Sequence, residues 1–87
     1  MNRVFVNITL YSGDVPNFEE LLPKEQAAAN EWKEEGILEH LFNRNDKNGV
    51  ILVLKDVDEV KAKLLVDTLP LAPYFRATEF IVTEQQF

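Results

Sequence analysis

The chain has 87 residues, no cysteine and a formal net charge of −6. This length suits one domain, which we place over residues 1–87, and the lack of cysteine excludes disulfides and thiolate metal sites. The nine Lys and Arg residues are scattered rather than clustered, so neither nucleic acid nor an anionic membrane is expected as a partner. No stretch approaches the ~20 apolar residues of a membrane span and no signal peptide is recognisable, so we expect a cytoplasmic protein.

The first predicted element is a strand over residues 3–11, where apolar and mixed side chains alternate. Its apolar face consists of Val4, Val6, Ile8 and Leu10, and its mixed face consists of Arg3, Phe5, Asn7, Thr9 and Tyr11. On the mixed face, Asn7, Thr9 and Tyr11 could hydrogen-bond a small polar ligand. They could equally belong to a partly hydrated interface, since interfaces favour the same mixture of polar and aromatic groups.

A helix is predicted over residues 18–35, with Asn17 and Glu20 as an N-terminal capping box and Gly36 just beyond its end. Pro23 falls inside this segment. Because proline lacks an N–H and fixes φ, either the helix kinks there or it restarts with Pro23 at its first position.

Glu25 lies in the middle of the apolar stripe of this helix, which is formed by Phe18, Leu21, Leu22, Ala28, Ala29 and Trp32. A carboxylate that faces a core is disfavoured unless it is paired or neutral, and desolvation raises its pKa. Such a group suits proton transfer to and from a substrate. The structural alternative is that Glu25, three positions into a restarted helix, caps the free N–H groups near Leu22.

Residues 37–44 and 49–55 are predicted strands, joined by a turn in which Asn48 and Gly49 adopt positive φ. The second of these strands is apolar on both faces and is therefore expected to be central. His40 shares a face with Leu38 and Phe42, a position where a single histidine is more often a core or interface group than a catalyst. Without a second histidine or a cysteine, no metal site is expected.

The second predicted helix opens with Asp56 and Glu59, and its inward face consists of Val57, Val60, Leu64 and Thr68, with Ala62 and Leu65 beside it. Residues 69–74 form an ordered connector that contains two prolines, and residues 75–83 form the last strand. The resulting order, β-α-β-β-α-β, predicts an α+β ferredoxin-like fold.

Two helices can cover only one face of a four-stranded sheet. The opposite face would expose Phe5, Tyr11, and Ile51 or Leu52, which is more apolar surface than a monomer usually presents. We therefore expect a homodimer or higher homo-oligomer that closes over this face and leaves a cleft between the two sheets.

Four segments resemble the muconolactone isomerase family. They are Glu35-Gly36 at the end of the first helix, Glu39-His40-Leu41-Phe42, Lys55-Asp56-Val57, and the connector Leu69-Pro70-Leu71-Ala72-Pro73-Tyr74. The resemblance implies a ferredoxin-like dimeric α+β barrel that assembles into larger rings. It also implies an enzyme that moves a proton between carbons of a small unsaturated lactone without metal or cofactor.

Counted back from Gly36, Glu25 aligns with the acid/base glutamate of this family. The family's Tyr-x-Asn in the third strand has no counterpart here, where Asn48 is the nearby polar residue. The resemblance leaves Tyr11, Tyr74 and His40 as substitutes for the missing tyrosine.

Two functions remain open at the level of sequence. One is cofactor-free proton transfer on a small unsaturated lactone or carboxylate, with Glu25 as acid/base and His40 and Tyr11 as further catalytic candidates. Its substrate-binding candidates are Asn7, Thr9, Asn48 and Arg76, and Arg76 or Arg3 would attract an anion to this acidic chain. The alternative is a non-catalytic small-molecule-binding or interaction module on the same barrel.

Overall fold

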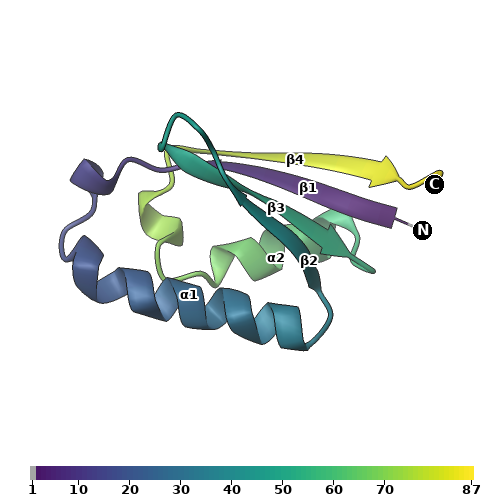
Figure 1. Ribbon diagram of the computed structural model, residues 1–87, viewed down its shortest axis with the longest axis horizontal. Coiled ribbons are helices and arrows are strands. Elements are labelled where there is room, and N and C mark those ends of the chain that lie inside the picture. The colour runs from purple at the N-terminus through teal and green to yellow at the C-terminus, as the bar shows by residue number, and fades with distance from the viewer. Residues whose placement is uncertain (1) are drawn as a thin grey trace.

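A four-stranded antiparallel sheet has two helices packed on one of its faces (Figure 1). The computed structural model describes residues 2–87. Its strands are β1 (Asn2–Thr9), β2 (Leu38–Asn43), β3 (Gly49–Lys55) and β4 (Ala77–Glu84), and its helices are α1 (Phe18–Glu34) and α2 (Glu59–Asp67). The strand order is β2-β3-β1-β4, which is compatible with a ferredoxin-like fold and confirms the predicted order of elements.

The core forms where β1 and β3, the two central strands, face the helices. Val6 pairs with Leu52 and Val4 with Leu54 in antiparallel register, and all four side chains are buried. Strict alternation in β1 placed one apolar face against the helices, as predicted. β3 lies between β2 and β1, so its predicted central position is also confirmed.

The helix α1 starts differently from the prediction but ends as predicted. Asn17 has a left-handed backbone, with φ of 59°, and its side chain makes no capping hydrogen bond, so the predicted capping box is wrong. An N-cap side chain reaches the first turn from an extended backbone, which Asn17 does not have. At the other end, Gly36 adopts φ of 80°, and the N–H of Ile37 bonds to the carbonyl of Trp32, as in a Schellman motif.

Pro23 lies inside a continuous α1, five residues after its first residue Phe18. The helix therefore does not restart at Pro23, and the interpretation of Glu25 as a cap of such a restart is wrong. One intrahelical hydrogen bond is lost at proline without ending the helix, because the neighbouring turns pack on the sheet.

The hairpin between β2 and β3 turns at Lys47, which has φ of 64°, while neither Asn48 nor Gly49 has a positive φ. The prediction of positive φ at these two residues is therefore wrong. Gly49 is required for another reason. A Cβ at Gly49 would lie 2.0 Å from the carbonyl oxygen of Ile8, so only glycine allows β3 to approach β1 this closely.

A register shift between Leu38 and His40 in β2 separates residues that were predicted to share a face. Leu38 is buried under the helices, whereas His40 and Phe42 lie on the sheet face away from them. A β-bulge produces this change, because its extra residue reverses the alternation of side chains. The sequence left open whether Ile51 or Leu52 lies on the face opposite the helices. The same pairing shows that Ile51 faces away from the helices and Leu52 faces the core.

The inward face of α2 also differs from the prediction. The helix begins after Asp58, whose side chain accepts a hydrogen bond from the N–H of Lys61, and not at Asp56. Ala62 and Val66 are buried, whereas Val60 and Leu64 are exposed by 68% and 63%. The helix α2 therefore packs on the sheet through the side that carries Ala62 and Val66.

We call the sheet face opposite the helices the open face; its apolar residues are Phe5, Phe42, Ile51, Val53 and Ile81. Phe5, Phe42 and Ile81 are exposed by 36%, 54% and 48%, as expected for a face that no helix covers (Figure 1).

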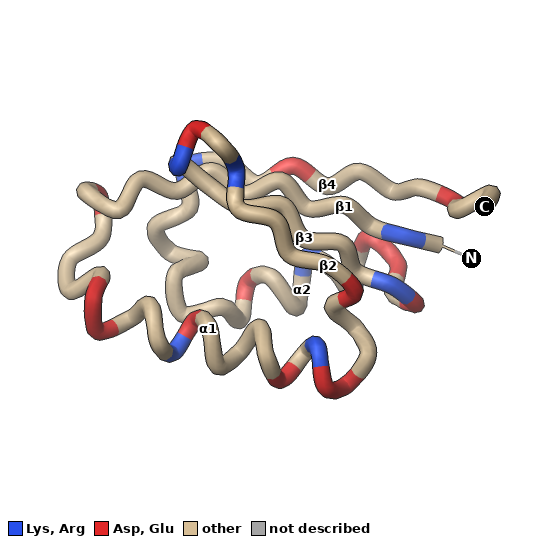
Figure 2. The backbone as a smooth tube through the Cα atoms, in the orientation of Figure 1, with Lys and Arg blue, Asp and Glu red and all other residues tan. Residues whose placement is uncertain are grey.

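Basic residues are dispersed over strands and helices (Figure 2). Among residues 2–87, no helix is long and apolar enough to cross a membrane.

Candidate functional site

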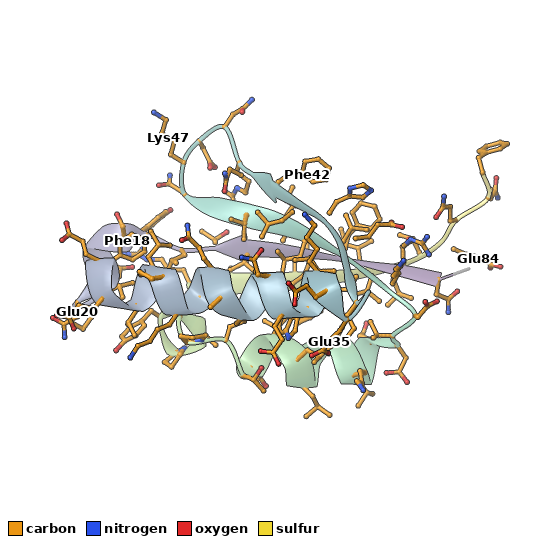
Figure 3. All side chains as sticks on the ribbon, turned by 60° about the horizontal axis from the view of Figure 1, so that its bottom comes forward. Phe18, Glu20, Glu35, Phe42, Lys47 and Glu84 are labelled. Atoms are coloured by element: carbon orange, nitrogen blue, oxygen red, sulfur yellow. The ribbon has the colours of Figure 1, made fainter. Side chains whose placement is uncertain are left out.

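A cavity of about 700 Å³ lies between α1 and the helix-facing side of the sheet. From α1 it is lined by Phe18, Leu22, Glu25, Gln26, Ala29 and Trp32, and from the connector after α2 by Leu69, Leu71 and Phe75. The hairpin residue Lys47 and the first helical residue Phe18 both belong to this lining and lie at the same end of the molecule (Figure 3). The walls are mainly apolar with a few polar groups, which is typical of a small-molecule site.

Glu25 is the acidic side chain of this cavity. One carboxylate oxygen, Oε1, accepts a hydrogen bond of 3.1 Å from the backbone N–H of Leu71. Desolvation raises the pKa of the Glu25 carboxyl above its ordinary value, while the hydrogen bond from Leu71 lowers it. Burial has the larger effect, so the proton is held more tightly than by an exposed glutamate.

The two oxygens of Glu25 have different environments. Oε2 makes no hydrogen bond to residues 2–87. No buried side-chain nitrogen or oxygen in this part of the chain lacks a partner, so Oε2 must be accessible to solvent. The carboxylate therefore has one fixed oxygen and one oxygen that can exchange a proton with a bound molecule.

Several polar groups near the cavity were missed by the sequence analysis. The lining includes Ser12, Gln26, Asn43, Asn45 and Lys47. Asn43 pairs with Val50 in the register of β2 and β3, which places it on the helix-facing side. Only the bulge in β2 determines this side, so the alternation of the sequence alone pointed the wrong way.

Arg44 also borders the cavity, but its guanidinium is already bound. Nη1 donates to Thr9 Oγ1 at 2.8 Å and to Asn7 Oδ1 at 3.3 Å, and Nη2 donates to Asp46. Asn7 and Thr9 lie on the same side of β1 as Phe5, which is the open face. These two predicted ligand-binding residues thus hold Arg44 and are not brought together with Glu25.

His40 lies on the open face as well. Its ring stacks on Phe42 with centroids 5.8 Å apart, and its Nε2 is 3.8 Å from Oε1 of Glu39. Glu39 in turn accepts two hydrogen bonds from Arg3 at 2.7 and 3.0 Å. Phe42 projects away from α1 (Figure 3), so a cleft between two sheets would contain His40 and not Glu25.

Tyr11 and Arg76 contact each other rather than the cavity. The Arg76 guanidinium lies 4.3 Å from the centre of the Tyr11 ring and donates to both carboxylate oxygens of Asp14, at 2.6 and 3.1 Å. This pairing lowers the pKa of Asp14. The cluster joins the 3₁₀ turn Ser12–Asp14 to the segment before β4.

Asn48 completes the hairpin through its backbone. Its N–H donates to Asp46 Oδ1 at 2.9 Å, and its carbonyl accepts from the N–H of Leu10 at 2.9 Å. Its side chain is not part of the cavity lining.

Of the residues predicted to form the site, only Glu25 lines the cavity. Among residues 2–87, no three His, Asp or Glu side chains lie close enough together to hold a metal ion.

Comparison with known proteins yields similarity in structure alone. No family model and no curated protein matches the sequence. A protein from Thermus thermophilus superposes with a TM-score of 0.59 at 14% identity, over 100% of this chain and 98% of its own. A hypothetical protein from Pyrococcus horikoshii gives 0.57 at 10% identity, over 99% and 93%.

The third similar structure is an enzyme. It is 5-chloro-2-hydroxyhydroquinone dehydrochlorinase (TftG) from Burkholderia phenoliruptrix AC1100, in complex with 2,5-dihydroxybenzoquinone. Its TM-score is 0.54 at 19% identity, over 95% of this chain and 93% of that chain. At these identities the likeness defines the fold only: this chain is a small α+β protein with the ferredoxin-like arrangement of a four-stranded sheet and two helices.

Proposed function

We propose that this chain is a divergent relative of the muconolactone isomerase family that transfers a proton on a small unsaturated lactone or carboxylate. Glu25 is the acid/base, and no cofactor takes part. The observation that carries the proposal is the state of the Glu25 carboxyl: it lies in a largely apolar cavity, with one oxygen fixed by a buried amide and the other accessible. Proton transfer from carbon requires a base that is poorly hydrated, oriented and reachable.

The reaction would use the accessible oxygen. Oε2 takes a proton from the carbon at the far end of the C=C–C=O system, the C–H bond breaks, and its electron pair moves through the conjugated system toward the carbonyl oxygen. The same oxygen then returns the proton to a different carbon, so the double bond shifts and Glu25 is regenerated. Donors that line the cavity, including the Gln26 amide and the Lys47 ammonium, are available to stabilise the developing negative charge.

The cavity volume and the similar enzyme structure support a ring-sized substrate. About 700 Å³ lies within the range of ~300–1,000 Å³ usual for small-molecule sites. The dehydrochlorinase of this fold was crystallised with 2,5-dihydroxybenzoquinone, a single unsaturated ring with several oxygens. We extend this substrate class, a small unsaturated ring that carries oxygens, to the present chain.

The proposed assembly is a homodimer that closes over the open face. Phe42 and Ile81, each about half exposed, would be buried in it. Because the cavity lies on the other side of the sheet, each protomer would keep its own Glu25 site.

The test is turnover of muconolactone by the purified protein and by Glu25→Gln, followed by the change in ultraviolet absorbance as the double bond leaves conjugation with the carbonyl. Gln keeps the shape and the acceptor for Leu71 but cannot take a proton, so turnover should fall by at least ~100-fold. His40→Gln serves as the control and should retain activity, because His40 lies on the open face. Absence of turnover in the unchanged protein would reject lactone isomerisation.

A second candidate function is a non-catalytic binding module. It is favoured by one observation: Glu25 already accepts a hydrogen bond from a buried backbone amide, which is a structural task. Under this alternative, 2,5-dihydroxybenzoquinone or a similar ring would bind in the cavity without conversion. Replacing Glu25 would then change stability and leave no activity to lose.

A further inference from the structure

The connector between α2 and β4, residues 69–75, forms one wall of the Glu25 cavity. Leu69 and Leu71 are exposed by only 5% and 2%, and both line the cavity together with Phe75. Pro70 and Pro73 restrict φ on either side of Leu71. The wall is therefore stiff, although it contains only a single 3₁₀ turn, Ala72–Tyr74.

The backbone N–H groups of this connector donate to carbonyls of the connector itself or of the end of α2, with one exception. Those of Leu69, Ala72, Tyr74 and Phe75 donate to the carbonyls of Val66, Leu69, Leu71 and Ala72, at 2.9 to 3.2 Å. The two prolines have no N–H. The N–H of Leu71 is left over, and it donates to Oε1 of Glu25 at 3.1 Å. Because a buried N–H without a partner is costly, the fold of the connector requires an acceptor at this point of α1.

We propose that the connector is the positioning element of the Glu25 site, in which the Leu71 amide fixes Oε1 so that Oε2 is the oxygen that exchanges protons with a bound molecule. This inference rests on the proposed function of Glu25 as acid/base. Leu71 itself is a positioning residue, since it acts through Glu25 and by its backbone. The connector, in which Leu71 lies 46 residues further along the chain than Glu25, thereby orients the carboxyl and lowers its pKa against the larger, raising effect of burial.

No other charged group takes over this task. Apart from Glu25, the charged side chains that line the cavity are Arg44 and Lys47, both on the hairpin between β2 and β3. Arg44 is engaged by Thr9, Asn7 and Asp46, and the causes of the shifted pKa of Glu25 are burial and the Leu71 hydrogen bond. Within residues 2–87, neither α2 nor the connector contributes a charged side chain to the lining.

The decisive variant replaces the Leu71 N–H by an ester oxygen and changes no side chain. The chain has no cysteine, so two synthetic halves can be ligated between Leu71 and Ala72 through a temporary cysteine at position 72, which is then desulfurised to alanine. The pKa of Glu25 is measured by NMR titration of a ¹³C-labelled side-chain carboxyl. It should rise in the ester, because the amide that favours the charged form is gone. An unchanged pKa would overturn the proposal.

A second set of variants keeps the test valid if the ester does not fold. Pro70→Ala and Pro73→Ala loosen the connector and should raise the pKa of Glu25 in the same direction. Pro16→Ala, in the exposed loop before α1, is the matched control and should leave it unchanged. Equal effects of all three proline variants would count against a specific role of the connector.

Hydrogen exchange of the Leu71 amide gives a readout that needs no substrate. Protection should survive in Glu25→Gln, whose side-chain oxygen still accepts the bond, and should fall at least tenfold in Glu25→Ala. Equal protection in both variants would show that Glu25 does not hold the connector. These results stand apart from turnover: loss of the muconolactone reaction alone would reject the proposed function, whereas an unmoved pKa in the ester would reject the positioning role.

Discussion

At the scale of single residues, Glu25 links stability to pH. Its pKa is raised in the folded protein, so the folded state binds this proton more tightly than the unfolded state does. This contribution to stability is fully present below the unfolded pKa and is lost as the pH rises through the folded pKa. Glu25→Gln should therefore gain stability relative to the parent chain between acidic and neutral pH, by a fraction of a kcal/mol because Oε2 remains accessible. Denaturant unfolding at several pH values measures this difference.

Glu25→Ala should behave in the opposite way. It leaves the buried N–H of Leu71 without an acceptor, at a cost of about 1–3 kcal/mol, and the loss should be present at every pH. Urea unfolding of the Gln and Ala variants side by side separates the two effects. If the Ala variant were as stable as the Gln variant, the hydrogen bond to Leu71 would contribute nothing to the fold.

Gly49 is a second residue whose role is local and steric. In Gly49→Ala the new Cβ would lie 2.0 Å from the carbonyl oxygen of Ile8, so β1 and β3 must separate. Overpacking of this kind costs about 1–3 kcal/mol, and thermal unfolding should detect it. Gly13→Ala is the control, since nothing lies within 4 Å of its Cβ, and it should change the free energy of unfolding by less than ~0.5 kcal/mol.

At the scale of elements, the two helices begin by different means, and this difference is testable. Asp58 caps α2 through its side chain, with Oδ1 2.7 Å from the N–H of Lys61. Asp58→Ala should destabilise the protein by about 1 kcal/mol. Asn17 precedes α1 with positive φ and no side-chain cap, so Asn17→Gly should be neutral or stabilising. Chemical unfolding measures the free energy of unfolding of both variants. A larger loss in Asn17→Gly than in Asp58→Ala would contradict the conclusion that only α2 has a side-chain cap.

At the scale of the whole molecule, the open face determines the predicted association. Phe42→Asp places a charge among the exposed apolar side chains of this face, on its edge strand β2, so it should convert a homodimer into a monomer, as measured by analytical ultracentrifugation. Leu64→Asp is the matched control, because Leu64 is similarly exposed but lies on α2. A chain that is monomeric before any substitution would reject the homodimer, and a dimer that dissociates only with Leu64→Asp would place the interface on the helices.

The sequence by itself determined the elements whose signals are local. Alternation in β1 identified the buried face that contains Val4 and Val6, and glycine at position 36 marked the end of α1. The helical period of the first helix placed Glu25 toward the core. Each of these signals depends on neighbours within a few residues, where the backbone geometry is fixed by steric preference.

Only the tertiary structure decided which groups meet Glu25. The bulge in β2 moved His40 to the open face, and packing on the sheet selected Ala62 and Val66 as the inward residues of α2. The partner of Glu25 is a backbone amide 46 residues away, and no local pattern in either segment encodes that pairing. Such contacts arise when the buried N–H of one segment must find an acceptor on another, and the whole fold determines which acceptor is within reach.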